Sequence, residues 1–199
     1  MIDEELFKRF INHEFPENDY EEREYLKFTE TNNFKWSSYP YFKRQIRDYL
    51  TSKYDCSHTV LDIGCGCGTY YYLLKNRFTN IDGIEGDADI IREAKLEDLY
   101  RKVFNTDACD FEFDYYDIII MGDCMEHIDY ERAYKLVEYL VPRCKELIIV
   151  IPYNLPLEAC EGKPYSAHKQ PDLAPDNMKE RYPMLNLLWG NEYIGVYTK

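Results

Sequence analysis

The 199-residue sequence has no uninterrupted apolar run of about 18 residues, the length that a membrane-spanning helix needs. Its first five residues include three acids, whereas a secretory signal peptide begins with basic residues. Basic residues are scarce throughout, because 24 Lys and Arg stand against 37 Asp and Glu, for a formal net charge of −13. Nucleic-acid binding draws most of its affinity from Lys and Arg. We therefore predict a cytoplasmic protein with no membrane partner and no nucleic-acid partner.

The cysteines lack the pattern of a metal site or of a disulfide framework. There are seven, an odd number, and they are scattered along the chain. Cys65 and Cys67 are separated by one residue where zinc knuckles use two or more, and no second close pair follows. We expect reduced, mostly buried thiols and no bound metal.

The apolar pattern predicts one domain in which strands and helices alternate. Residues 1–40 carry no strand pattern and predict a helical accessory layer, either a lid over a ligand or a pad on a sheet edge. Proline-rich residues 152–183 predict mostly loop. This order is typical of an α/β fold with a doubly wound, mainly parallel seven-stranded sheet, helices on both faces, a C-terminal antiparallel hairpin and an N-terminal helical extension. Strands are expected at 60–63, 81–85, 103–104, 117–121, 147–151, 186–189 and 193–197, and helices at 42–50, 70–74, 90–99 and 133–141.

A strand-to-helix turn at residues 64–68 is the clearest local signal, with glycine at every second position. Glycine lets the backbone adopt positive φ and approach a ligand closely, so this turn can enclose a flat polar molecule. A dinucleotide fold would need G-x-G-x-x-G, and here the third glycine, Gly68, comes one residue too early. A P-loop would need Lys followed by Ser or Thr, and Thr69-Tyr70 supplies no Lys.

Two motifs resemble those of class I S-adenosylmethionine-dependent methyltransferases. The G-x-G-x-G turn preceded by Asp62 resembles the first motif of that family. The predicted sheet with a C-terminal hairpin is similar to the seven-stranded sheet of the family, which ends in a hairpin. Residues 121–128, Met-Gly-Asp-Cys-Met-Glu-His-Ile, resemble the D-x-x-E-H-I/L signature of small-molecule and quinone O-methyltransferases. The resemblance covers residues 55–151 well and the rest poorly. It implies a cofactor-binding core at 55–151, an acceptor loop and terminal hairpin at 152–199, and S-adenosyl-L-methionine as cofactor with S-adenosyl-L-homocysteine as product.

The resemblance also implies which residues bind the cofactor. Glu85 lies 17 residues past Gly68, where a carboxylate accepts both ribose hydroxyls, with Asp87 as a substitute. Asp107 would meet the adenine amino group. Because the cofactor carries a positive sulfonium, we expect carboxylates and few cations in the pocket. The full predicted set, including Asp62 for the methionine ammonium, is Asp62, Gly64, Cys65, Gly66, Glu85, Gly86, Asp107, Ala108 and Asp123.

Candidates for catalysis follow the fourth and fifth strands. His127 is the first candidate for a base, because imidazole is easily poised near neutral pH. An equally good interpretation is that its ring holds the loop by a hydrogen bond. Asp123 and His168 complete the candidate set, and His168 falls in the loop where the family builds acceptor contacts.

The leading hypothesis is methyl transfer to a small-molecule or saccharide-like acceptor, at oxygen rather than nitrogen. Ile151-Pro152-Tyr153-Asn154 is similar to the N/D-P-P-Y motif of amide and adenine methyltransferases, but it begins with Ile and follows the fifth strand instead of the fourth. One alternative is a protein methyltransferase whose aromatic loop 34–41 binds a peptide. Another is an accessory protein that binds the cofactor without catalysis. The sequence assigns no oligomeric state.

Overall fold

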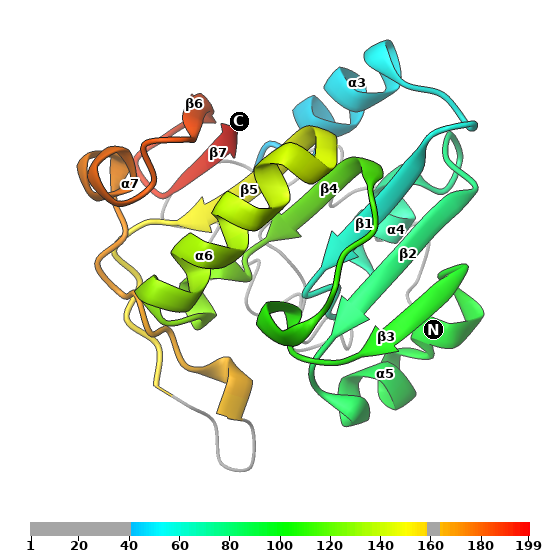
Figure 1. Ribbon diagram of the computed structural model, residues 1–199, viewed down its shortest axis with the longest axis horizontal. Coiled ribbons are helices and arrows are strands. Elements are labelled where there is room, and N and C mark those ends of the chain that lie inside the picture. Colours follow the sequence, from blue (N-terminus) through cyan, green and yellow to red (C-terminus); the bar gives the residue numbers. More distant parts are fainter. Residues whose placement is uncertain (1–40, 159–163) are drawn as a thin grey trace.

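The computed structural model describes residues 41–158 and 164–199 (Figure 1). The helical layer predicted for residues 1–40 lies outside this part, as does Cys160. The six other cysteines form no disulfide within the described residues. No helix in the same part of the chain has the length and apolar character needed to cross a bilayer.

A seven-stranded sheet runs through the molecule in the order β3-β2-β1-β4-β5-β7-β6. The first five strands pair in parallel, whereas β7 is antiparallel to both β5 and β6. The predicted mainly parallel sheet with a terminal antiparallel hairpin is confirmed. The strands are β1 (Thr59–Ile63), β2 (Asn80–Glu85), β3 (Lys102–Asn105), β4 (Tyr116–Gly122), β5 (Cys144–Pro152), β6 (Asn186–Gly190) and β7 (Ile194–Thr198).

Helices cover both faces of the sheet, as the doubly wound pattern predicted (Figure 1). The helices are α3 (Lys43–Lys53), α4 (Thr69–Leu74), α5 (Ala88–Ala94), α6 (Tyr130–Leu140) and α7 (Pro175–Arg181). Single 3-10 turns occur at η1 (Leu96–Asp98), η2 (Ala108–Asp110), η3 (Met125–His127), η4 (Val141–Arg143) and η5 (Pro164–Ser166).

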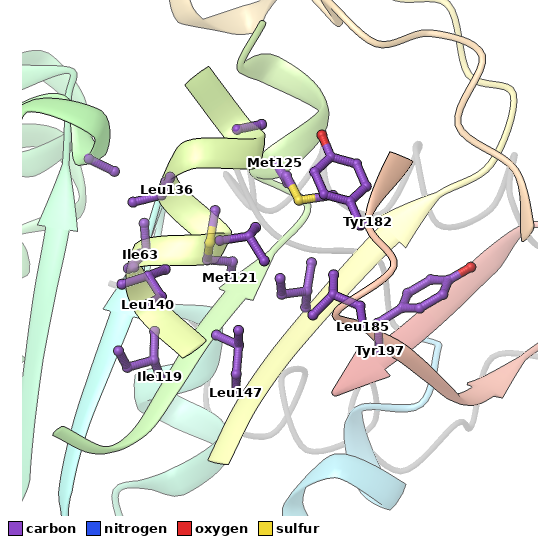
Figure 2. Packing of buried hydrophobic residues seen from close by; sticks show 14 of the residues in the cluster. Ile63, Ile119, Met121, Met125, Leu136, Leu140, Leu147, Tyr182, Leu185 and Tyr197 are labelled. Carbon is purple, nitrogen blue, oxygen red and sulfur yellow. The ribbon is translucent and has the colours of Figure 1, made fainter. Parts of the chain in front are cut away.

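The sequence of the central strand β4 is a continuous apolar run because both faces of the strand are covered. Successive strand residues point to opposite faces. Ile118 and Ile120 pack with the cluster that includes α3 and α4, whereas Ile119 and Met121 pack with the cluster that includes α6 and α7. Figure 2 shows the second cluster, with side chains of β4 and β5 lying between the sheet and α6. All four β4 residues are fully buried, because each face of the strand is covered.

Glu146 on β5 joins α3 to the sheet. This nearly buried carboxylate accepts hydrogen bonds from Tyr49 (3.1 Å), Lys53 (2.6 Å), Tyr54 (3.3 Å) and Thr198 (2.8 Å). Three of the donors belong to α3 or the residue that follows it, and the fourth to β7. A buried carboxylate is costly unless such donors compensate its lost hydration. The network therefore fixes the last turn of α3 against the sheet.

The described residues of 152–183 are mostly loop, as predicted, and include the short helix α7, whose first turn holds Pro175, where a missing amide hydrogen costs nothing. One local prediction was wrong. The helix after β2 ends at Ala94 and not near Leu99. Lys95 ends it with a left-handed backbone conformation, φ 53°.

Candidate functional site

The predicted site residues lie at or just beyond the carboxyl ends of the parallel strands, where the strand order reverses. Strand β1 pairs with β2 on one side and with β4 on the other, so the chain leaves β1 at the switch point of the topology. Open α/β sheets bind ligands in the crevice outside such a point. The turn after β1 is the one with three glycines.

The glycine turn has the backbone that its sequence predicted. Gly64, Gly66 and Gly68 have φ values of 68°, 52° and 87°, all in the left-handed region. The amides of Gly64 and Cys65 donate to the carbonyl of Ile84 at 2.9 and 3.0 Å. Cys65 therefore contributes backbone to the turn, while its thiol is buried. These bonds fold the turn against the end of β2.

Glu85, the last residue of β2, also holds this turn. Its side chain is 7% exposed and accepts hydrogen bonds from the amides of Gly66 (3.0 Å) and Asp87 (2.9 Å), one on each oxygen. Burial raises the pKa of Glu85, while the two amide donors oppose that rise. A carboxylate offers about four acceptor positions, so roughly two remain for a ligand. Asp87 itself caps α5, where it accepts from the Asp89 amide.

Asp62 on β1 lies 1% exposed beneath the turn. The Tyr100 hydroxyl donates to its Oδ2 at 2.5 Å, and its Oδ1 has no hydrogen-bond partner among the described residues. Burial raises the pKa of Asp62 to about 7, and the Tyr100 hydrogen bond works in the opposite direction. Buried acceptors are nearly always paired in folded proteins. The second oxygen of Asp62 thus has the character of a ligand contact.

Lys43 is a site residue that the sequence did not reveal. It opens α3, is fully buried and donates to the Tyr70 hydroxyl at 3.0 Å. Its ammonium lies 3.9 Å from Asp123 Oδ2. Burial lowers the pKa of Lys43 to about 8, although Asp123, Asp62 and Glu126 all favour its charged form. Within the described residues, a buried ammonium therefore lies among the carboxylates that were predicted here.

Because Gly122 has no side chain, the Tyr70 ring that holds Lys43 can pack directly over it. The Tyr70 ring lies over Gly122 so closely that a Cβ on Gly122 would overlap it. The same ring carries the hydroxyl that accepts from Lys43. Gly122 is the last residue of β4, directly before Asp123.

Asp107 and Ala108 lie beyond β3, as predicted. Asp107 Oδ1 accepts from the Cys109 amide at 2.9 Å, and its Oδ2 accepts from Arg132 at 3.2 Å. Ala108 is buried. Gly86 is covered from the other side by the loop after β5, because a Cβ there would lie 3.2 Å from the Tyr165 ring.

The residues predicted to act in catalysis begin directly after β4. Asp123 has a positive φ of 50°, and its amide donates to the carbonyl of Val150 at 3.0 Å. Glu126 is 1% exposed, and neither of its carboxylate oxygens has a hydrogen-bond partner in the described part of the chain. Burial, followed by the charge of Asp123, raises the pKa of Glu126 well above its usual range.

The structure brings His127 and His168 together, although 41 residues separate them in sequence. Their ring centroids lie 4.6 Å apart, and the planes are almost perpendicular at 85°. His127 Nδ1 lies 3.1 Å from the Ala167 carbonyl, and His168 Nδ1 lies 2.6 Å from the Leu155 carbonyl. Burial, with His168 adding to it, lowers the pKa of His127 to about 4, so this ring is neutral near pH 7. Burial also lowers the pKa of His168.

Gly64→Ala is expected to destabilise the protein by roughly 2 kcal/mol, because a left-handed conformation is costly for residues with a Cβ. The new Cβ would also lie 2.5 Å from the sulfur of Cys124. In a domain of this size the melting temperature should fall by about 4–8 °C.

Gly190→Ala is the matched control, because a Cβ there meets nothing nearer than 3.4 Å and the residue has no positive φ. Its melting temperature should stay close to that of the wild type. Equal melting temperatures for the two variants would contradict the role given to the turn.

The family model described as a methyltransferase domain matches residues 12–134, which is more than half of the chain. No curated protein sequence matches significantly.

Solved structures share the fold at low sequence identity. A S-adenosylmethionine-dependent methyltransferase from Clostridium acetobutylicum ATCC 824 has a TM-score of 0.65 and 14% identity, over 92% of this chain and 99% of that chain. Magnesium protoporphyrin IX methyltransferase from Synechocystis PCC 6803, with bound S-adenosylhomocysteine, has a TM-score of 0.57 and 14% identity, over 78% of this chain and 80% of that chain. The plantazolicin methyltransferase BpumL, in complex with S-adenosylhomocysteine, has a TM-score of 0.56 and 14% identity, over 99% of this chain and 96% of that chain.

Proposed function

Since the chain belongs to the methyltransferase-domain family, we propose that it transfers a methyl group from S-adenosyl-L-methionine to a small-molecule or saccharide-like acceptor, at oxygen. The observation that carries the proposal is the unpartnered Oδ1 of Asp62, buried beneath a turn of three glycines with positive φ. Two of the related structures hold S-adenosylhomocysteine.

The charges of the site fit the amino-acid end of the cofactor. Asp62 offers a buried carboxylate oxygen to the ammonium group, and Lys43 offers a buried ammonium to the carboxylate group. Opposite charges that are buried together stabilise each other far more than they would in water. Lys43 therefore extends the set of residues predicted to bind the cofactor.

The nucleoside end fits the tips of β2 and β3. Glu85 uses one acceptor position of each oxygen to hold the turn and has others for the ribose hydroxyls. Asp107 lies beyond β3, beside the buried Ala108, for the adenine. The bare backbone of the turn, with Gly64 and Gly66, leaves room for the cofactor to lie against it.

When bound, the cofactor supplies an electrophilic methyl group, and the protein contributes alignment and exclusion of water. His127, His168 and Asp123 surround the acceptor side. His127 is unprotonated near pH 7 and can accept a proton, but a pKa of about 4 makes it a weak base. The peptide-binding alternative depends on the aromatic loop 34–41, of which only Tyr41 is described, and no observation favours it.

Calorimetry tests the cofactor and an acceptor panel tests the reaction. S-adenosylhomocysteine should bind with micromolar or better affinity, and NAD should not bind. A panel of hydroxylated small molecules and saccharides, with a peptide panel beside it, should give methylated product only from the first group. Absence of S-adenosylhomocysteine binding would overturn the proposal, and binding without product from any acceptor would favour the accessory role.

The affinity for S-adenosylhomocysteine should fall by up to about tenfold between pH 8 and pH 6, because a carboxyl with pKa about 7 is mostly ionised at the first pH and mostly protonated at the second. Lys43, with a pKa of about 8, gains charge over the same range and offsets at most about twofold of this fall. Only the ionised form of Asp62 attracts the ligand ammonium. The charged and titratable groups that act on Asp62 are Tyr100, Glu85 and Lys43.

Asp62→Asn is the control for this pH dependence. It should bind more weakly at pH 8 and lose the decrease toward pH 6, as measured by calorimetry. The same tenfold decrease in Asp62→Asn would show that another group is responsible.

A further inference from the structure

We propose that Glu126, His127 and His168 bind a divalent metal cation on the acceptor side of the site. Each side chain offers one ligand atom, and the three atoms lie within 4.8 Å of one another. The three residues come from two segments, the turn η3 after β4 and the loop after β5. The sequence analysis singles out His127 and His168 for catalysis and predicts no bound metal, so this cluster is a departure from that prediction.

Glu126 provides the first independent support. A carboxylate that is 1% exposed is very costly unless it is paired, yet neither oxygen has a partner among the described residues. The nearest basic ring nitrogen, His127 Nε2, is 4.0 Å from Oε1, too far for a hydrogen bond. A cation between these atoms would satisfy the carboxylate.

The two histidines are oriented as metal ligands are. In each ring Nδ1 faces a backbone carbonyl, Ala167 for His127 and Leu155 for His168. A neutral ring that donates from Nδ1 has its lone pair on Nε2, and this outer contact is the one that metal-binding histidines usually make. The Nε2 lone pair of each ring then remains for a metal, and His127 Nε2 already lies 4.0 Å from Glu126 Oε1.

The ligand geometry requires only a small adjustment. Ligands about 2.1 Å from a tetrahedral metal are roughly 3.4 Å apart. The atoms of the cluster, within 4.8 Å, therefore need to approach by little more than the length of a bond. Two imidazoles and one carboxylate suit Mn²⁺, Fe²⁺, Co²⁺ or Zn²⁺ better than Ca²⁺, which prefers oxygen ligands alone.

Such a metal would keep open coordination positions, because three protein ligands do not complete its shell. An acceptor oxygen bound there would be held beside the cofactor site, and a cation also lowers the pKa of a bound hydroxyl or water. The binding of an acceptor at the metal rests on the proposed function, whereas the binding of the cation itself does not depend on it.

The test is titration of EDTA-treated protein with Co²⁺, followed by visible absorption and calorimetry. We expect one Co²⁺ per chain, with absorption bands typical of nitrogen and oxygen ligands. Glu126→Gln and His168→Ala should each weaken Co²⁺ binding by more than the roughly 10- to 100-fold that loss of an outer contact costs. His58→Ala is the control, because His58 precedes β1, far along the strand from the site, and pairs with Asp55 at 3.0 Å.

A second measurement needs no variant. Mn²⁺ bound at the cluster should broaden the NMR signals of the His127 and His168 rings selectively and leave His58 sharp. Equal broadening of all histidine signals, no broadening, or Co²⁺ affinity unchanged in Glu126→Gln and His168→Ala would overturn the metal site.

Binding of S-adenosylhomocysteine in EDTA separates the two proposals. If it binds there and no Co²⁺ binds to the wild type, the metal site is wrong and the proposed function stands. If Co²⁺ binds as described and S-adenosylhomocysteine does not, the metal site stands and the proposed function fails.

Discussion

Glu85→Ala should weaken the binding of S-adenosylhomocysteine by about 100-fold or more. Two hydrogen bonds from ribose hydroxyls to a carboxylate contribute roughly 1.5 kcal/mol each, and every 1.4 kcal/mol is about tenfold in affinity. The variant also removes the acceptor of the Gly66 amide, so the glycine turn loses one of its attachments to β2. Calorimetry at constant pH measures the change directly.

Glu93→Ala on α5 is the matched control, since it removes the same carboxylate from an exposed position. Its affinity should stay within about twofold of the wild type, because isolated surface charges contribute little. An unchanged affinity in Glu85→Ala would remove Glu85 from the site. A loss of affinity that accompanies general unfolding is recognised from the melting curve of the unliganded variant.

Glu146→Ala should lower the free energy of unfolding by about 3 kcal/mol, although it lies away from the cofactor site. The substitution leaves the hydroxyls of Tyr49, Tyr54 and Thr198 without their acceptor in a partly buried position, and each such loss costs of the order of 1 kcal/mol. The Lys53 bond adds little, since that side chain is 43% exposed. In a domain of this size, 3 kcal/mol corresponds to a melting temperature lower by about 6–12 °C.

Glu138→Ala, on the exposed side of α6, gives the comparison for this effect. Its melting temperature should change by no more than about 1–2 °C, as for most surface substitutions. If Glu146→Ala and Glu138→Ala have the same melting temperature, the Glu146 network does not stabilise the attachment of α3.

The arrangement of the sheet could be predicted from the sequence because its strongest elements are governed by local rules. A run such as Ile118-Ile119-Ile120 is short, β-branched and apolar at every position, which is typical of a strand covered on both faces. Glycine at every second position after β1 allows positive φ, and the structure has it at Gly64, Gly66 and Gly68. Aspartate is a preferred residue at a helix N-cap, and Asp87 caps the helix after β2.

The contents of the site were less predictable because they depend on contacts between distant segments. Lysine is a residue type that is usually exposed, yet Lys43 lies on the same face of α3 as the buried Ile46 and Leu50. Its partner there, the hydroxyl of the Tyr70 ring that packs over Gly122, comes from a distant segment. His127 and His168 were each noticed, yet nothing in a sequence says that a ring after β4 will meet one from the loop after β5. Helix α7 was not predicted, because the prolines of residues 152–183 were interpreted as loop signals, whereas Pro175 begins this helix.

The overlap between Tyr70 and the space above Gly122 has an evolutionary consequence. Any side chain at position 122 would displace the ring and, with it, the hydroxyl that accepts from Lys43. Natural variation at the three positions should therefore be correlated: homologues that keep lysine at 43 and tyrosine at 70 should keep glycine at 122. Homologues without glycine at 122 should have a smaller residue at 70 and a basic residue at another position in place of Lys43.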